Sequence, residues 1–171
     1  MPQSERKKLE ASSWFSVVRT YQECTRRYAQ MLQAFDLTLT QFDVLNAIRG
    51  LGEHAMPKQI AEQLVVTRGN VTGVVHRLQE RGLLLTRNNE HDGRSFFCEL
   101  TPTGKQVLER ARQATATFID QQLAPFTDDD LRLTERHMNK MRSHLQTIDP
   151  ETISNGVIRG RSKDDEEKTL R

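Results

Sequence analysis

The chain has 171 residues, of which 36% are hydrophobic and 28% are charged, which is enough apolar material for one ordinary domain core. Its formal net charge is only +2 at pH 7, which excludes a strongly basic protein that binds nucleic acid through net charge alone. The N-terminal residues MPQSERKKLE are charged with no apolar run behind them, and no segment approaches membrane-spanning length, so we expect a cytoplasmic protein.

The first predicted element is a long amphipathic helix over residues 13–35. Its apolar side chains fall on one stripe at the helical spacing of about 100° per residue. They are Trp14, Val17, Val18, Tyr21, Tyr28, Met31, Leu32 and Phe35. A second helix is expected over residues 39–48, because Phe42, Leu45 and Ile48 share one side and glycines follow at positions 50 and 52.

Two helical segments follow in close succession. The first opens at Pro57, a residue suited to the first helical position, and turns Ile60, Ala61 and Leu64 toward a core. A short turn at residues 65–66 separates it from the second segment.

The second of these helices carries the clearest pattern in the chain. Thr67 is a good N-cap, and Gly82 is the expected C-terminal stop after Arg81, a cation that suits the negative end of the helix dipole. Its inward stripe repeats at i, i+3, i+4 and i+7 and consists of Val71, Val74, Val75 and Leu78. The outward face carries Gly69, Gly73 and His76, flanked by Thr72, Asn70 and Arg77. Groups of these kinds suit phosphates and base edges of DNA.

Both glycines of that outward face are costly in a helix, by about 1 kcal/mol each relative to alanine. We hypothesise that the missing side chains at Gly69 and Gly73 let the helix backbone approach the major groove of DNA. The alternative is an exposed helix that simply tolerates glycine.

Two short strands are predicted next. Residues 83–87 and 95–100 contain apolar and aromatic residues typical of strands, and residues 88–93 are turn formers around the pair Asp92-Gly93. The order helix, turn, helix and hairpin predicts a winged helix-turn-helix, a mainly α-helical fold with a small β-hairpin wing.

Three basic residues cluster on or beside the tip of this hairpin. They are Arg87, His91 and Arg94. A long cation at that place reaches the minor groove or its flanking phosphates. Solvated loop charge is the alternative, but the neighbouring helix favours contact with DNA.

Two further helices are expected after the hairpin. Thr101 caps and Pro102 opens a helix over residues 102–123. A helix over residues 127–148 begins at Thr127 with three aspartates in its first turn, which complement the positive end of the helix dipole.

The predicted terminal helices, over residues 13–35, 102–123 and 127–148, carry more apolar surface than a small winged domain covers. We therefore expect them to pair with a second copy of the chain. Residues 149–171 mix glycine, serine and charge with little apolar content, which predicts a disordered charged tail.

These residues resemble the multiple antibiotic resistance regulator (MarR) family of bacterial transcription factors. The family's recognition-helix pattern is matched by Thr67, Val71, Thr72, Val75, Leu78, Gly82 and Leu83. Its wing signature is matched by Asp92, Arg94, Leu100, Thr101 and Gly104. The resemblance covers residues 12–148 in the order of elements and places a DNA-binding lobe at about residues 39–100, between N- and C-terminal dimerisation helices.

The resemblance implies a sequence-specific transcriptional regulator, a homodimeric repressor that binds a pseudo-palindromic operator with half-sites about 10 bp apart. It also implies a possible effector, since members of the family commonly respond to small aromatic or phenolic acids. Arg94 would enter or border the minor groove, and Asp92 would hold the wing tip in shape, while many members carry a basic residue in place of Gly93. The residues expected to contact DNA are Thr67, Arg68, Asn70, Thr72, His76, Arg77, Arg87 and Arg94.

No pattern indicates an enzyme, a cofactor or a metal site. The five histidines and two cysteines make no metal-ligand spacing, and the sequence has neither a phosphate-cradling glycine loop nor a nucleophile motif. Two alternatives stay open: a winged-helix protein-interaction module whose exposed helix binds a partner chain, and a regulator that senses oxidants through cysteine. Cys24 lies on the apolar side of its helix and Cys98 in a wing strand, so we expect both to serve packing.

Overall fold

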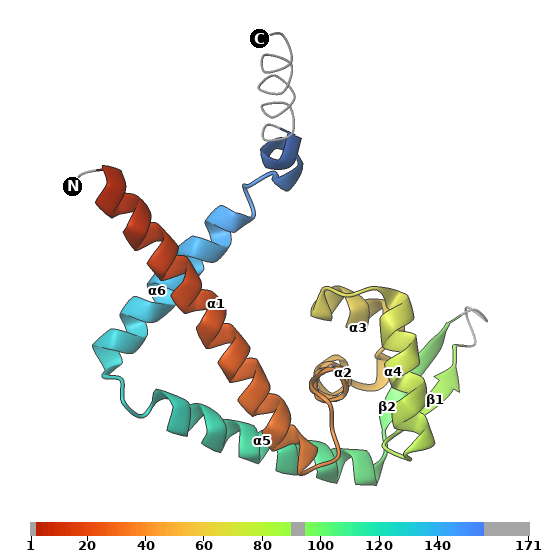
Figure 1. Ribbon diagram of the computed structural model, residues 1–171. Helices are drawn as coiled ribbons and strands as arrows, with labels where there is room; N and C mark the ends of the chain where they lie inside the picture. The colour runs from red at the N-terminus through yellow and green to blue at the C-terminus, as the bar shows by residue number, and fades with distance from the viewer. Residues whose placement is uncertain (1–2, 90–94, 156–171) are drawn as a thin grey trace, which may run out of the picture. The chain divides into compact units, whose positions relative to one another are not determined.

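The computed structural model describes residues 3–89 and 95–155. Figure 1 shows the elements in chain order: α1 (Gln3–Gln33), α2 (Leu39–Leu51), the 3₁₀ turn η1 (Gly52–His54), α3 (Pro57–Leu64), α4 (Arg68–Glu80), β1 (Leu84–Asn88), β2 (Phe96–Leu100), α5 (Pro102–Leu123) and α6 (Asp128–Leu145). The chain divides into two compact units, Met1–Gln122 and Leu123–Arg171. The first unit holds the predicted helix-turn-helix and a two-stranded antiparallel wing, so the predicted fold class is confirmed.

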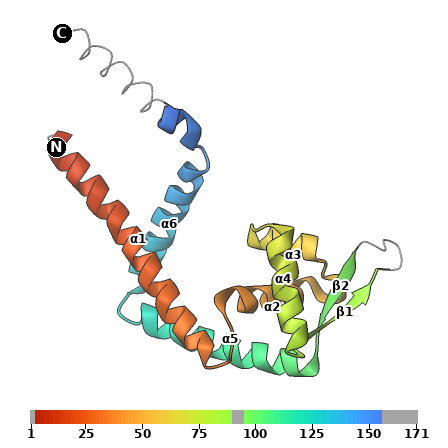
Figure 2. The same cartoon turned by 45° about the vertical axis from the view of Figure 1, so that its right-hand side comes forward.

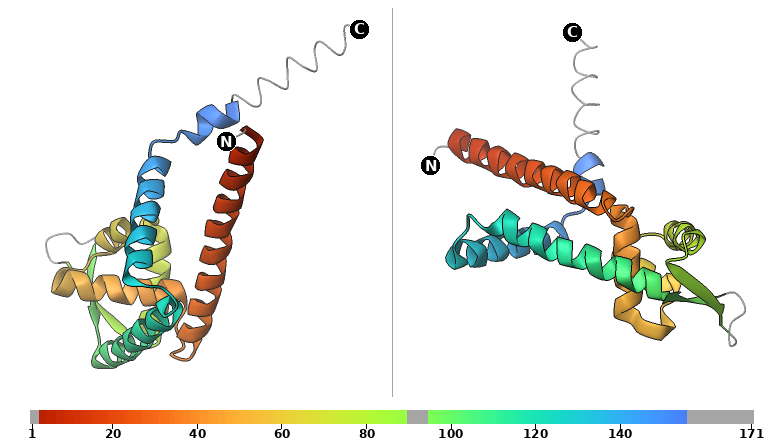
Figure 3. Two further views of the ribbon diagram at one scale, coloured as in Figure 1. Left: turned by 90° about the vertical axis from the view of Figure 1, so that its left-hand side faces the viewer. Right: turned by 90° about the horizontal axis from the view of Figure 1, so that it is seen from below.

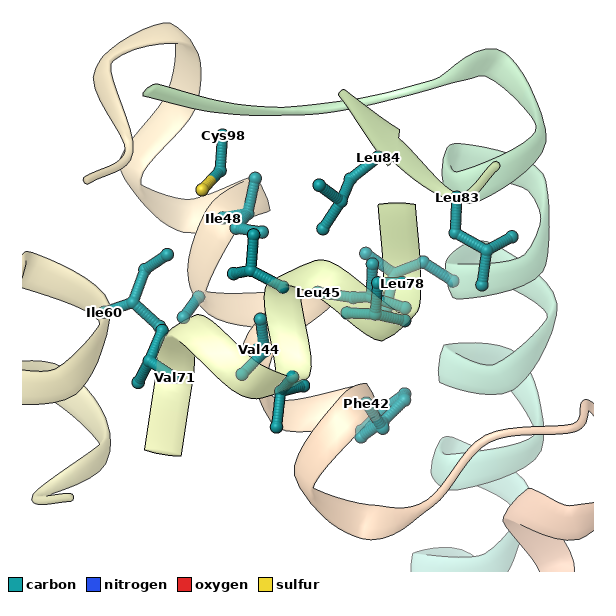
Figure 4. Packing of buried hydrophobic residues seen from close by; sticks show 14 of the residues in the cluster. Phe42, Val44, Leu45, Ile48, Ile60, Val71, Leu78, Leu83, Leu84 and Cys98 are labelled. Atoms are coloured by element: carbon teal, nitrogen blue, oxygen red, sulfur yellow. The ribbon is translucent and has the colours of Figure 1, made fainter. Parts of the chain in front are cut away.

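The core of the first unit lies where α2, α3, α4 and the two strands meet. The predicted inward residues of α2 and α4 are all buried, and Figure 4 shows Leu45, Ile48, Val71 and Leu78 in this cluster. Full burial of such a side chain is worth about 1.5–3 kcal/mol. The inward stripe of α4 therefore holds this helix against α2, and its other face is left outward.

Local signals set both ends of α4, as the sequence predicts. Thr67 is the N-cap, and its hydroxyl accepts a hydrogen bond from the Asn70 amide at 3.4 Å. Gly82 adopts a left-handed φ of 67°, and the next amide, that of Leu83, donates to the carbonyl of Leu78 at 2.9 Å. Helix α4 consequently ends sharply and leads into β1, and Figure 2 shows the helix lying beside the hairpin.

The hairpin turns one face toward the core. In its register Leu84 pairs with Leu100 and Asn88 with Phe96. Leu84 and Cys98 are fully buried, and the Cys98 amide donates to the Ala55 carbonyl at 2.8 Å. The wing is therefore tied to the segment after η1 as well as to the core.

Helix α5 begins in close contact with the junction between α4 and β1. The Thr101 hydroxyl donates to the Gly82 carbonyl at 2.8 Å and accepts from the Gly104 amide at 2.9 Å, which confirms Thr101 as the predicted cap. Gly104 is buried, and a Cβ at this position would lie 1.8 Å from the carbonyl oxygen of Leu83. Glycine at 104 lets the two backbones touch.

Helix α1 differs from its prediction in two ways. It begins at Gln3 rather than at residue 13, because residues 4–11 are mostly good helix formers without an apolar stripe to reveal them. The predicted buried stripe holds only in the C-terminal part, where Leu32 is buried. Trp14 and Tyr21 are 59% and 69% exposed. Within the described part of the first unit, the N-terminal part of the stripe is therefore left largely exposed.

The second unit contains α6, which begins with the predicted capping box. The Thr127 hydroxyl accepts from the Asp130 amide at 3.3 Å, and the Asp130 carboxylate accepts from the Thr127 amide at 3.0 Å. The Thr127 hydroxyl also donates to the Asp130 carboxylate at 2.6 Å, and this bond, together with the one from the Thr127 amide, lowers the pKa of Asp130. Residues 150–155 are helical, whereas residues 156–171 of the predicted tail lie outside the described part of the chain. Figure 3 shows α6 and this short helix from two sides.

We predict that Gly104→Ala destabilises the protein by about 3 kcal/mol, at the upper end of the usual cost of overpacking. The added methyl would overlap the Leu83 carbonyl oxygen. Because this oxygen is a backbone atom and the methyl carbon is bonded directly to the backbone, no side-chain rotation can relieve the contact. Urea unfolding followed by circular dichroism measures the difference.

Gly50→Ala is the matched control. Gly50 lies in α2, and a Cβ there would meet no atom within 4 Å, so alanine should stabilise the helix by about 1 kcal/mol. Equal unfolding midpoints for the two variants would contradict the proposed contact at Gly104.

Candidate nucleic-acid interface

Helix α4 brings together six of the eight predicted contact residues. All six are exposed, and they belong to the N-cap or to the helix itself: Thr67, Arg68, Asn70, Thr72, His76 and Arg77. Because the opposite stripe of α4 is buried in the core, this polar face points away from it. Its role in binding DNA stays a prediction.

Side chains of this face bond mainly within their own helix. The Thr72 hydroxyl donates to the Arg68 carbonyl at 3.0 Å, and the Arg77 Nε donates to the Gly73 carbonyl at 3.2 Å. The His76 Nδ1 lies 3.3 Å from a carboxylate oxygen of Glu80. Such exposed intrahelical pairs are worth only a few tenths of a kcal/mol, so a polar ligand can replace them.

The two glycines of α4 have no packing role within the described residues. A Cβ at Gly69 would meet no atom within 4 Å, and one at Gly73 would meet only the Arg77 Nη2, at 3.8 Å. Alanine would fit at both positions and would raise helix stability by about 1 kcal/mol each. The described residues thus give no packing reason for either glycine, which is compatible with the predicted close approach of another molecule to the α4 backbone.

Arg87 is paired on the outer face of the wing. Its Nη2 lies 2.9 Å from a carboxylate oxygen of Glu99, and its guanidinium carbon lies 5.9 Å from the centre of the Phe97 ring. The Phe97 ring also contacts the His54 ring, with 5.4 Å between the ring centroids. Arg87 would have to leave or share Glu99 in order to contact a phosphate.

The predicted wing-tip residues Asp92, Gly93 and Arg94 lie outside the described residues, as does His91. Their roles stay predictions. Arg87 is thus the one predicted wing contact whose surroundings the structure describes.

A cleft of about 610 Å³ lies under the outer face of the wing. Its charged lining consists of Arg49, Arg87, Lys105, Glu53, Glu99 and Glu109. Arg49 and Glu109 approach to 3.9 Å. These residues come from the end of α2, from η1, from the hairpin and from the start of α5. No sequence motif links them, and sequence reasoning missed the cleft. Its cations and carboxylates balance, which favours no class of charged ligand.

A second cleft, of about 490 Å³, lies between α2, α3 and α5. Phe42, Leu64 and Ile119 supply apolar walls, and Arg112 supplies a cation that donates to the Asn46 side chain at 2.9 Å. Next to this region the Tyr28 ring contacts Phe42 edge-on, and its hydroxyl lies 3.0 Å from the Thr115 hydroxyl. Burial raises the pKa of the Asp43 carboxyl, which also lines the cleft.

The two cysteines differ in burial. Cys98 is fully buried, and burial raises its pKa to about 11, so the thiol stays protonated at neutral pH. Cys24 is half-buried, with its thiol 3.5 Å from the side-chain oxygen of Gln122. The packing expectation fits Cys98 well. In the described ranges no three His, Cys, Asp or Glu side chains group as metal ligands, and no helix there is long and apolar enough to cross a membrane.

Comparisons of the sequence identify related transcriptional regulators. A family model described as MarR family matches residues 35–95. An uncharacterized HTH-type transcriptional regulator of Bacillus cereus is 30% identical over 125 residues, which cover 73% of this chain and 80% of the relative. The multiple antibiotic resistance protein MarR of Salmonella typhimurium is 31% identical over 111 residues, which cover 64% of this chain and 76% of the relative.

Solved structures share the fold. An organohalide-sensing transcriptional regulator in its 2,4-dichlorophenol-bound form matches with a TM-score of 0.72 and 19% identity, covering 84% of this chain and 85% of that one. A mutant of MarR from E. coli complexed with operator DNA matches with a TM-score of 0.68 and 24% identity, covering 77% of this chain and 95% of that one. These similarities show that this chain has the MarR-like winged helix-turn-helix fold.

We predict that Glu99→Gln tightens binding to DNA about two- to fivefold, because it frees Arg87 to contact a phosphate. The pair is exposed, and such pairs are worth at most about 1 kcal/mol, which sets this range. Fluorescence anisotropy at fixed salt measures the change. In an Arg87→Gln background the gain should disappear, as a double-mutant cycle requires of a coupled pair.

Glu109→Gln controls for the loss of a negative charge from the same cleft. It frees Arg49 on α2 and Arg112 on α5 and leaves the wing pair intact, so its effect on DNA binding should be small. An equal gain from both carboxylate substitutions would show that net charge, and not the release of Arg87, is responsible.

Proposed function

The chain belongs to the MarR family of transcriptional regulators and binds DNA through a helix-turn-helix, and from this membership we propose that it is a cytoplasmic, homodimeric repressor of a pseudo-palindromic operator. In this proposal α4 enters the major groove and the wing lies along the adjacent minor groove or its phosphates. The contact residues are those expected from the sequence, from Thr67 on the N-cap to Arg94 at the wing tip.

The outward face of α4 carries the proposal. Two glycines on this face lower the stability of the helix, although the described residues leave room for a side chain at both positions. Hydroxyl, amide, imidazole and guanidinium groups surround them. These groups are donors and acceptors that suit base edges and phosphates, and the absent side chains leave room for the edges of a groove. A protein partner would instead favour an apolar patch on this face.

A homodimer is supported by the apolar surface of the terminal helices. Leu9, Trp14 and Phe15 are large exposed hydrophobic residues of α1, and Leu133 and Met138 are exposed on α6. Within α6 no residue is buried at all. A second copy that covers these helices would remove this surface from water, and its two-fold symmetry would match the two halves of a palindrome.

We extend the proposal to a small aromatic effector that binds in the cleft between α2, α3 and α5. The cleft has a size within the usual range for small-molecule sites, apolar and aromatic walls, and a cation at Arg112 for a phenolate or carboxylate. It borders α3 of the helix-turn-helix on one side and α5 on the other. A ligand that binds more tightly when α3 and α5 are arranged as in the free protein than when they are arranged for DNA binding would shift the balance toward free protein.

We predict specific, salt-sensitive binding of two chains to one operator duplex, and at least about a tenfold loss of affinity in Gly73→Leu. The leucine side chain would stand between the α4 backbone and the bases, and a tenfold loss corresponds to about 1.4 kcal/mol. Fluorescence anisotropy on DNA from the gene's own upstream region, against a scrambled duplex, measures affinity. Light scattering of the complex measures stoichiometry.

Gly50→Leu serves as the matched control, since this glycine also lies in a helix with open space around it but belongs to α2. Its affinity for DNA should equal that of the wild type. Undiminished binding by Gly73→Leu would remove the close-approach hypothesis, and one chain of 19.7 kDa per particle at micromolar concentration would refute the dimer.

We also predict that millimolar 2,4-dichlorophenol or benzoate weakens operator binding by at least threefold, and that Ala116→Phe abolishes this response. Ala116 lines the cleft but is exposed, so a phenyl group there fills the site without disturbing the core. The same anisotropy titration, repeated at fixed effector concentration, gives both values. A response that survives in Ala116→Phe would move the effector to another site.

A further inference from the structure

The turn between α3 and α4 contains a valine in a costly conformation. Val65 has φ 55° and ψ 46°, in the left-handed region. A β-branched residue is rarely found there, and the conformation costs of the order of 1–2 kcal/mol. The other described non-glycine residue with positive φ is Asp36, whose short polar side chain tolerates this region better.

The backbone of this turn explains the conformation but not the side chain. The Val65 amide donates to the Glu62 carbonyl at 3.3 Å, and the Val66 amide donates to the Ala61 carbonyl at 3.0 Å, which closes the end of α3. Glycine or asparagine at position 65 would make the same bonds with less strain.

The side chain of Val65 packs little against the described residues. It is 90% exposed, more than any other large hydrophobic residue among those described, and Val66 beside it is 42% exposed. Both valines therefore present methyl groups to the surroundings. A strained residue that gains nothing from its own fold points to a function at the surface.

The position of these valines suggests what they meet. Val65 lies two residues before Thr67, the N-cap of α4. In helix-turn-helix proteins the N-terminal residues of the recognition helix contact the base edges, so the turn before it lies at the rim of the major groove. The apolar group that DNA offers in that groove is the C5-methyl of thymine, whereas the phosphate backbone offers charge.

We propose that Val65, supported by Val66, contacts a thymine methyl group and reads a T·A base pair at the edge of each operator half-site. The inference rests on the proposed function, since it requires α4 to enter the major groove. It assigns a specificity role to a turn that carries no polar side chain for base recognition, next to the polar face of α4.

The test replaces each thymine of the operator with deoxyuridine, which removes only the methyl group. For wild-type protein, one symmetric pair of positions should weaken binding about three- to tenfold in fluorescence anisotropy. Val65→Gly should bind the thymine operator as weakly as the wild type binds the deoxyuridine operator. Replacing thymine with deoxyuridine should cause no further loss of affinity in Val65→Gly. Val66→Ala should show a smaller loss in the same direction.

Two controls separate this contact from damage to the fold or to DNA binding in general. Val65→Gly should unfold at the same or a higher denaturant concentration than wild type, because glycine relieves the left-handed strain. Leu85→Ala removes an exposed apolar side chain from the outer face of the wing and should leave sensitivity to deoxyuridine unchanged.

The outcomes distinguish the two proposals. The methyl contact would be overturned if the wild type binds specifically and Val65→Gly binds as well, or if the substitution weakens binding equally on the thymine and deoxyuridine operators. Either result would leave the proposed repressor function standing. Binding without preference for any duplex would overturn both.

Discussion

The contact between Gly104 and the backbone of Leu83 is the constraint on which the arrangement of the first unit depends. At that point the end of α4, the start of β1 and the first turn of α5 meet, and any side chain at position 104 would hold them apart. The Thr101 hydroxyl bridges the same junction by donating to the Gly82 carbonyl while it caps α5. One glycine and one threonine thus fix α4 and the hairpin relative to α5, the helix that leads out of the lobe.

The same junction explains how a protein of nearly neutral charge presents a surface suited to DNA. The core holds the inward stripe of α4, so its polar face must point outward, and the hairpin beside it carries its cation on the outer face. Glu99 pairs with Arg87 and so limits the net charge of the lobe. In the proposed complex with DNA, affinity would depend on where the cations lie and on the exchange of Glu99 for a phosphate at Arg87 more than on total charge.

Several residues at this surface lower the stability of the fold. Gly69 and Gly73 reduce helix propensity, and Val65 occupies a strained conformation, while the buried stripe beneath them is well packed. A residue that lowers the stability of the fold is expected at a position where function requires it. The apolar surface left exposed on α1 and α6 belongs to the same category in the proposed homodimer, where a second copy of the chain would cover it.

The sequence by itself determined the elements and their order, because caps, stops and periodicity act over a few residues. Thr67 and Gly82 bound α4 as predicted, and the bounds predicted for α5 agree with the structure. Only the tertiary structure decided that Arg87 pairs with Glu99 and that the predicted stripe of α1 is buried only near its C-terminal end. The Arg87–Glu99 pair follows from the register of the two strands, and the burial of the α1 stripe follows from which elements cover it. Both depend on residues distant in the chain.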